Sequence, residues 1–292
     1  MRPERDDIAI PPFPADLEWV GSVPPSVERL SARGPALIHF VDVADLNSVR
    51  TLPYLGAWND RYAGKGLAVL AVNSPRFPFT ARRDAVGAIL ERLGIRFPVA
   101  IDERYLAWRS YGCEGWPSLF LWGRGGVLRW FHFGEGAYVE SERAIQGELG
   151  EPSAPSPPEL PQPLEPLRAS DVPGAAVVVP TEEVFPGGAI DVPWRGGQGP
   201  VEIEYAAGGA FASLDGRGEL QVRVDDGAEG VVEVPGPGLY PLAEHERHEP
   251  HFLAVAPSAG VLLHSISFAA GVPEGRPAST PPPPRPDTSG LP

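Results

Sequence analysis

Hydrophobic and polar positions between residues 17 and 150 follow two different periods. Three short apolar runs are typical of buried strands: 34–41, 66–73 and 97–102. Residues 45–63 and 80–93 instead carry apolar side chains at three- and four-residue spacing, which indicates two amphipathic helices. The first part of the chain is therefore expected to alternate strand and helix.

The next stretch predicts a hairpin and a last helix. Residues 118–122 and 127–133 are apolar runs separated by the turn Gly-Arg-Gly-Gly at 123–126, which indicates a β-hairpin. A final helix is expected at about 138–149. This order of elements predicts an α/β domain over residues 17–150, with a mixed sheet and helices on both faces.

The pattern changes after this domain. Residues 151–169 are proline-rich and favour an extended, semi-rigid linker. Residues 170–272 contain short alternating runs separated by turn residues, which predict an all-β sandwich. We expect residues 1–16 to form an N-terminal arm and residues 273–292 to form a disordered proline-rich tail.

Composition narrows the class of protein. The chain has 24 basic and 38 acidic side chains and a net charge of −14. Such an acidic surface argues against nucleic acid and anionic membranes as partners. The sequence shows neither a run of about 20 apolar residues nor the apolar core of a signal peptide. A cytoplasmic protein is therefore expected.

Several stretches carry a resemblance to a known family. They are R-T-L-P-Y-L at 50–55, R-L-G-I-R-F-P-V-A-I-D at 92–102, W-R-S-Y-G at 108–112 and W-P-S at 116–118. Together they resemble the TlpA/DipZ-type thioredoxin-like domains. This resemblance implies a thioredoxin-like fold for roughly residues 30–150.

The second domain also carries a resemblance. The stretches G-L-Y-P-L at 238–242, H-F-L-A-V at 251–255 and G-V-L-L-H-S-I-S-F at 260–268 are similar to the C-terminal module of DipZ-type proteins. That module looks like a carbohydrate-binding β-sandwich, so the resemblance implies a jelly-roll-like domain after the linker.

The family's redox motif is degenerate in this sequence. Where the family has Cys-x-x-Cys at a helix start, this chain has Asp45-Leu46-Asn47-Ser48. Thiol–disulfide exchange needs one thiolate to attack a disulfide and a second thiol to resolve the mixed species. Asp45 and Ser48 can do neither, so we expect no dithiol chemistry at this motif.

Two structural features of the family's redox site are retained in this sequence, the helix N-cap and the cis-proline. Asp45 is a favoured helix N-cap residue, and the positive end of a helix also stabilises its negative charge. Trp116-Pro117 matches the family's cis-proline, which presents its backbone to an extended substrate. The resemblance therefore implies a protein- or peptide-binding groove formed by Asp45, Trp116 and Pro117.

Cys113 is the single cysteine, which excludes an intramolecular disulfide within this sequence. It lies four residues before Pro117 and is an alternative reactive thiol. Its nearest basic neighbour in sequence is Arg109, so no adjacent cation is seen that would lower its pKa. We expect Cys113 to be an ordinary small residue in a loop.

Three histidines recur at three-residue intervals: His245, His248 and His251. Imidazoles at this spacing can bind zinc or nickel. Pro250, however, prevents a helical arrangement, and we expect a loop that enters a strand. No metal and no cofactor is assigned from the sequence.

The leading hypothesis is a redox-inactive thioredoxin-like protein that acts as a protein- or peptide-binding or scaffold component. An alternative is a thiol-dependent reductase or peroxidase that uses Cys113. A third possibility is glycan binding by the C-terminal β-module. The sequence favours a non-enzymatic role and leaves the oligomeric state open.

Overall fold

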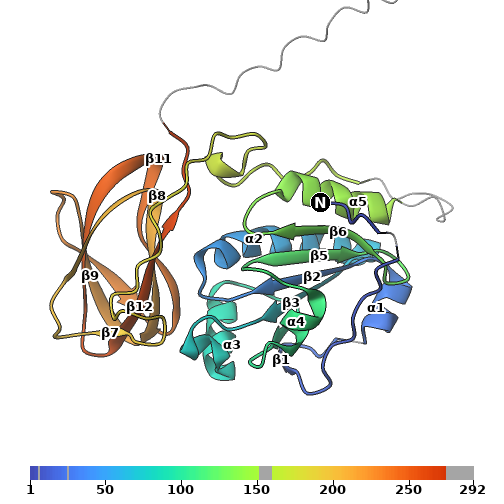
Figure 1. The fold of residues 1–292 in the computed structure, drawn as a ribbon, viewed down its shortest axis with the longest axis horizontal. Helices are drawn as coiled ribbons and strands as arrows, with labels where there is room; N and C mark the ends of the chain where they lie inside the picture. Colours follow the sequence, from blue (N-terminus) through green and yellow to red (C-terminus); the bar gives the residue numbers. More distant parts are fainter. Residues whose placement is uncertain (6, 25, 151–159, 274–292) are drawn as a thin grey trace, which may run out of the picture.

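The computed structural model describes residues 1–5, 7–24, 26–150 and 160–273. It consists of an α/β domain and a β-domain that lie side by side (Figure 1). Residues 151–159 of the expected linker and 274–292 of the expected tail lie outside the described residues. Within the described residues, no helix has the length and apolar character needed to cross a membrane.

The α/β domain is built on a six-stranded mixed sheet. Its strands are β1 (Glu18–Val20), β2 (Ala36–Val41), β3 (Ala68–Asn73), β4 (Val99–Ile101), β5 (Ser118–Trp122) and β6 (Leu128–Phe133). The hydrogen-bonded order is β1-β4-β3-β2-β5-β6. Strands β2, β3 and β4 are parallel, whereas β1, β5 and β6 pair with their neighbours in antiparallel fashion.

Helices cover both faces of this sheet. They are α1 (Val27–Arg33), α2 (Leu46–Tyr62), α3 (Arg83–Arg92), α4 (Leu106–Tyr111) and α5 (Tyr138–Leu149), with 3₁₀ turns η1 (Ala63–Lys65) and η2 (Pro78–Ala81). Side chains of α2, α3 and α5 share one core, and α1 and α4 share the core on the opposite face. The domain has the thioredoxin-like fold that the sequence predicts.

The helix expected at 80–93 begins later, at Arg83. Pro78 starts a separate 3₁₀ turn, because proline suits the first position of a helical turn but has no N–H to continue a longer one. Three short elements, β1, α1 and α4, were not predicted. Each has seven residues or fewer, which is too short to show a clear hydrophobic period.

The β-domain is all antiparallel. Its strands are β7 (Trp194–Arg195), β8 (Val201–Gly216), β9 (Gly218–Val224), β10 (Gly230–Val234), β11 (Gly238–Pro257) and β12 (Val261–Ala269). They pair in the order β10-β9-β11-β8-β12-β7. Strand β11 shifts register between Glu244 and Glu249, and such irregularities bend a strand and increase its twist. Buried side chains from β8 to β12 form the core of this domain.

The arm and the described end of the linker are attached to the α/β domain. Ala9 in the arm bridges to Val127, and its neighbour Ile10 packs into the core on the α1 and α4 side. Leu160 and Leu164 of the linker pack against the core on the α2 side. The described part of the expected linker, residues 160–169, is therefore docked on the α/β domain.

Candidate functional site

The start of α2 carries the degenerate redox motif. Asp45 is the N-cap, and its carboxylate accepts hydrogen bonds from the Ser48 backbone N–H at 3.0 Å and the Ser48 hydroxyl at 2.9 Å. This confirms the predicted cap. The Ser48 hydroxyl also accepts a hydrogen bond of 3.2 Å from the Asp42 N–H. Its proton and one of its lone pairs are therefore both used in hydrogen bonds at the start of α2. Both side chains are buried, Asp45 with 6% of its surface exposed.

Arg76 joins this helix start to the second domain. Its guanidinium pairs with Asp45 on one side and with Glu183 on the other, the latter at 2.7 Å. Burial raises the pKa of Asp45, and Arg76 opposes that effect. Burial alone would lower the pKa of Arg76, but the two carboxylates outweigh it and raise that pKa. We call Asp45, Arg76 and Glu183 the interdomain ion cluster.

A second buried carboxylate, Asp42, lies beneath this cluster. It accepts hydrogen bonds from the Thr80 hydroxyl at 2.5 Å, the Ala44 N–H at 2.7 Å and the Arg76 N–H at 2.5 Å. Burial raises the pKa of Asp42 to about 6. Asp42 therefore holds the backbone on both sides of the cluster, at the end of β2 and in the segment after β3.

The β-domain covers the start of α2. Leu46, only 4% exposed, packs in one apolar cluster with Phe211, Ala269 and Leu239. The Ser213 hydroxyl, on β8, donates a hydrogen bond of 2.9 Å to the carbonyl of Ala44. The helix start is therefore an interdomain contact.

Further contacts between the two domains flank this one. Arg82 pairs with Asp215 at 2.9 Å, and Arg92 donates to the Pro237 carbonyl at 2.7 Å. The sequence predicts a binding groove formed by Asp45, Trp116 and Pro117. The structure places Asp45 at the contact between the two domains, with only 6% of its surface exposed.

The Trp116–Pro117 loop has different surroundings. The bond between these residues is cis. The Trp116 indole donates to the Ser74 carbonyl at 2.8 Å and lies 4.3 Å, centroid to centroid, from the ring of Trp108. Trp116 and Trp108 are half-buried, and the neighbouring Leu106 is 38% exposed. Pro117 itself is buried, so the apolar surface here consists of the partly exposed Trp116 with Leu106 and Trp108 of α4.

A buried histidine lies beside that loop. His39, on β2, hydrogen-bonds through Nδ1 to the Ser118 carbonyl at 3.1 Å. Burial lowers the pKa of His39 to about 3. The imidazole is therefore neutral at physiological pH, and its Nδ1 donates the proton to the carbonyl.

Cys113 is half-buried and packs against the core on the α1 and α4 side of the sheet. Helix α2 lies on the other side. Burial raises the pKa of the Cys113 thiol well above its ordinary value. The structure therefore does not bring Cys113 and the degenerate motif into one reactive site.

The three histidines lie on β11, not in the loop that the sequence predicts. The rings of His245 and His251 stack with centroids 3.6 Å apart. His245 Nε2 is 2.7 Å from the Tyr205 hydroxyl, and His251 Nδ1 is 2.8 Å from Asp225. The described part of the chain contains no group of three or more residues arranged to hold a metal ion.

Sequence reasoning missed Arg76, Glu183 and Asp42. Asp42 had a visible signal, because it is a charged residue at the end of an apolar run expected to be a buried strand. Arg76 and Glu183 had none, since their contact joins positions 107 residues apart in different domains.

No family model matches the chain. Protein DipZ of Mycobacterium bovis and of Mycobacterium tuberculosis is 26% identical over 280 residues, which cover 83% of this chain and 40% of DipZ. This chain thus spans well under two thirds of the length of those relatives. NHL repeat-containing protein 2 of Bos taurus is 30% identical over 134 residues, covering 45% of this chain and 18% of that protein.

Solved structures also match. A thioredoxin-like superfamily protein is 22% identical with a TM-score of 0.46, covering 50% of this chain and 99% of its own. A thiol-disulfide isomerase from Corynebacterium glutamicum is 21% identical with a TM-score of 0.42, covering 48% of this chain and 97% of its own. The match to DipZ covers 83% of this chain, which is more than its thioredoxin-like domain.

Proposed function

We propose that this chain is a redox-inactive thioredoxin-like protein that acts as a protein-binding or scaffold component. The observation that carries the proposal is the interdomain ion cluster. Asp45 occupies the position of the attacking sulfur and is held by Arg76 beneath the β-domain. A carboxylate engaged in this way has no nucleophilic role toward a disulfide.

The remaining thiol does not replace the missing pair. A thiolate is the reactive form of cysteine, and burial raises the pKa of Cys113. A single thiol also leaves the mixed disulfide without an internal resolving group. These two arguments favour binding over a reductase or peroxidase activity.

The partner surface that we propose is the Trp116–Pro117 loop. An extended peptide would pair with the backbone beside Pro117, as in other recognition by strand addition. The rings of Trp108 and Trp116, with Tyr105 6.3 Å from Trp116, would receive its apolar side chains. Half-buried aromatic residues that are fixed in place lose little conformational entropy when they bind.

The first test is an insulin-disulfide reduction assay with dithiothreitol as the electron donor. The protein and its Cys113→Ser variant are expected to give the same rate as dithiothreitol alone. Turnover well above that rate, lost in Cys113→Ser, would show an enzyme and would refute the proposal.

The second test measures peptide binding directly. Extended peptides selected on the immobilised protein should lose at least tenfold in affinity toward Trp116→Ala. Trp194→Ala, a change on β7 of the other domain, serves as the matched control and should bind as the wild type does. Equal binding by all three proteins would place the partner surface elsewhere.

Glycan binding by the β-domain is a second candidate, favoured by one observation. A cavity of about 480 Å³ is lined by aromatic and acidic side chains, among them Tyr205, Phe252, Asp225 and Glu204. Aromatic faces and carboxylates are the groups that stack on and hydrogen-bond to sugars. A glycan array should show binding that Phe252→Ala removes, and a blank array would dismiss this candidate.

A further inference from the structure

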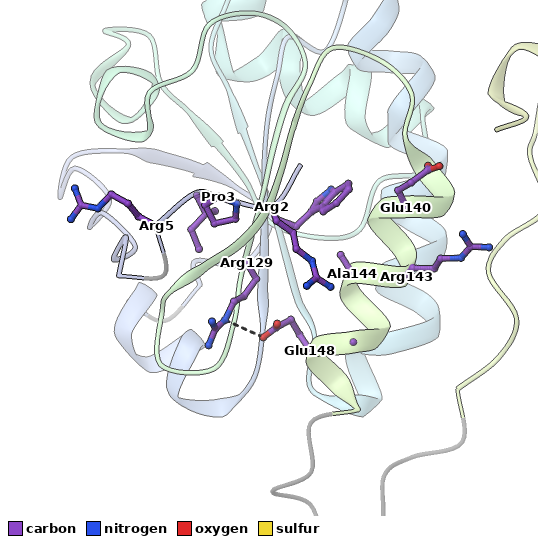
Figure 2. A pocket seen from close by; sticks show the side chains of 11 residues that line it. Arg2, Pro3, Arg5, Arg129, Glu140, Arg143, Ala144 and Glu148 are labelled. Carbon is purple, nitrogen blue, oxygen red and sulfur yellow. Dashed lines mark ion pairs between the residues drawn. The ribbon is translucent and has the colours of Figure 1, made fainter. Parts of the chain in front are cut away.

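A cavity of about 620 Å³ lies between the N-terminal arm, β6 and α5 (Figure 2). It is separate from the interdomain ion cluster and from the Trp116–Pro117 loop. Its volume falls within the range of ordinary small-molecule sites.

The pairing of the arm with β6 explains why the cavity exists. Phe131 donates its N–H to the Met1 carbonyl at 2.9 Å, and Leu128 donates to the Ile8 carbonyl at 2.9 Å. The eight arm residues from Met1 to Ile8 thus lie against only four residues of β6, from Leu128 to Phe131. The arm is longer than the strand segment that it pairs with, and the cavity lies between the two and α5.

The cavity is lined by more positive than negative side chains. They are Arg2, Arg5, Arg129 and Arg143 against Glu140 and Glu148. Figure 2 shows Arg2 and Arg129 over the cavity, with Arg5 and Arg143 directed outward at its rim. A local excess of arginine is notable in a chain whose net charge is −14.

The two inner arginines are available to a ligand. Arg129 forms a long ion pair with Glu148, 3.7 Å from Nε to the carboxylate and beyond hydrogen-bond distance, and its side chain is 41% exposed. Among the residues that the structure describes, Arg2 pairs with no carboxylate. A guanidinium carries a fixed charge and a planar fork of donors that matches carboxylate and phosphate oxygens.

The lining also includes apolar groups. Trp130 lines the cavity, and its indole donates to the Ser141 hydroxyl at 3.1 Å, which fixes the ring. Ala144 and Gly147, on α5, add small side chains that leave room beside the ring. A ligand that fits both kinds of lining has anionic groups at one end and an apolar body at the other.

We propose that this cavity binds a small organic anion. Carboxylate or phosphate groups lie between Arg2 and Arg129, and the apolar body lies against Trp130. The site depends on neither the degenerate redox motif nor the peptide-binding surface, so its occupation is independent of the function proposed above.

The test is isothermal titration calorimetry of the full chain at about 50 mM salt, where charge pairs are weakly screened. Phenyl phosphate and phthalate each place two negative charges on an aromatic ring, and inorganic phosphate lacks the apolar body. One-to-one binding of phenyl phosphate or phthalate is expected, at least tenfold tighter than that of inorganic phosphate. Whichever aromatic dianion binds more tightly identifies the anionic group.

Variants locate the binding. Arg2→Gln and the double variant Arg2→Gln/Arg129→Gln should weaken the binding at least tenfold, and thermal unfolding checks that both remain folded. Arg104→Gln, an exposed arginine paired with Asp16, is the matched control and should bind as the wild type does. Absence of saturable binding at 10 mM ligand, or equal affinity in the double variant, would overturn the proposal.

Discussion

The start of α2 and the Trp116–Pro117 loop form one groove in the family that this chain resembles, yet here they differ in exposure. The helix start is covered by Phe211 and Ala269 of the β-domain. The loop keeps half-buried tryptophans near the surface. In this chain the helix start is therefore closed, whereas Trp108 and Trp116 beside Pro117 remain partly exposed.

A buried titratable side chain lies next to each half of the groove, and burial shifts the two pKa values in opposite directions. Asp42 lies under the covered half, and burial raises its pKa to about 6. His39 lies beside the open half, and burial lowers its pKa to about 3. In both cases burial favours the neutral form, because a low-dielectric interior penalises charge.

The largest expected effect concerns the covered half. Arg76→Ala leaves Asp45 and Glu183 without their cation, and removing one partner of a buried ion pair costs about 3–5 kcal/mol. Urea unfolding measures the loss. Arg82→Ala, which breaks the more exposed pair with Asp215, should cost less than about 1 kcal/mol. Similar losses for both variants would contradict a special role for the ion cluster.

The next effect compares the two buried titratable groups. The folded pKa of His39, about 3, is below its ordinary value of 6.5, so the stability it contributes is lost as the pH falls below 6.5. The folded pKa of Asp42, about 6, is above its ordinary value of 3.8, so its contribution is lost as the pH rises toward 6. Between pH 4 and 6 the contribution of His39 changes by about 2.5 kcal/mol and that of Asp42 by about 2 kcal/mol, in opposite directions.

Variants separate the two contributions. The unfolding free energy of the wild type minus that of His39→Asn should increase from pH 4 to pH 6. The same difference for Asp42→Asn should decrease over that range. Differences that do not change with pH would show that these groups titrate alike in the folded and unfolded chain.

A smaller effect is expected at the contact between the domains. Ser213→Ala removes the hydrogen bond to the Ala44 carbonyl, which is worth about 1 kcal/mol. Ser110→Ala, at an exposed position on α4, is the control and should cost less than about 0.5 kcal/mol. Equal unfolding midpoints for the two variants would argue that the Ser213 contact adds nothing.

The smallest effect concerns Cys113. Because burial raises its pKa, its thiolate fraction at pH 8 is below that of an ordinary thiol. Alkylation by iodoacetamide should be slower than that of a free thiol such as glutathione, with no inflection below pH 9. A faster rate, with an inflection near neutral pH, would favour the one-cysteine enzyme.

The strand and helix periods were enough to predict most of the α/β domain. Helix α5 was placed at its observed bounds, and the Asp45 cap followed from residue type alone. The burial of Asp45 under the β-domain could not be predicted. Glu183 and Ser213 of that domain reach Arg76 and Ala44 beside Asp45 only through tertiary packing. Local periodicity carries no information on such distant contacts.

Alkylation of an introduced cysteine at Leu46 tests the central claim, that the β-domain closes the former redox site. In a Cys113→Ser background, Leu46→Cys should react at least a hundredfold more slowly than Asn47→Cys, because Leu46 is buried against Phe211 whereas Asn47 is exposed. Both variants should regain equal, rapid rates in urea. Equal rates in the native protein would contradict the account.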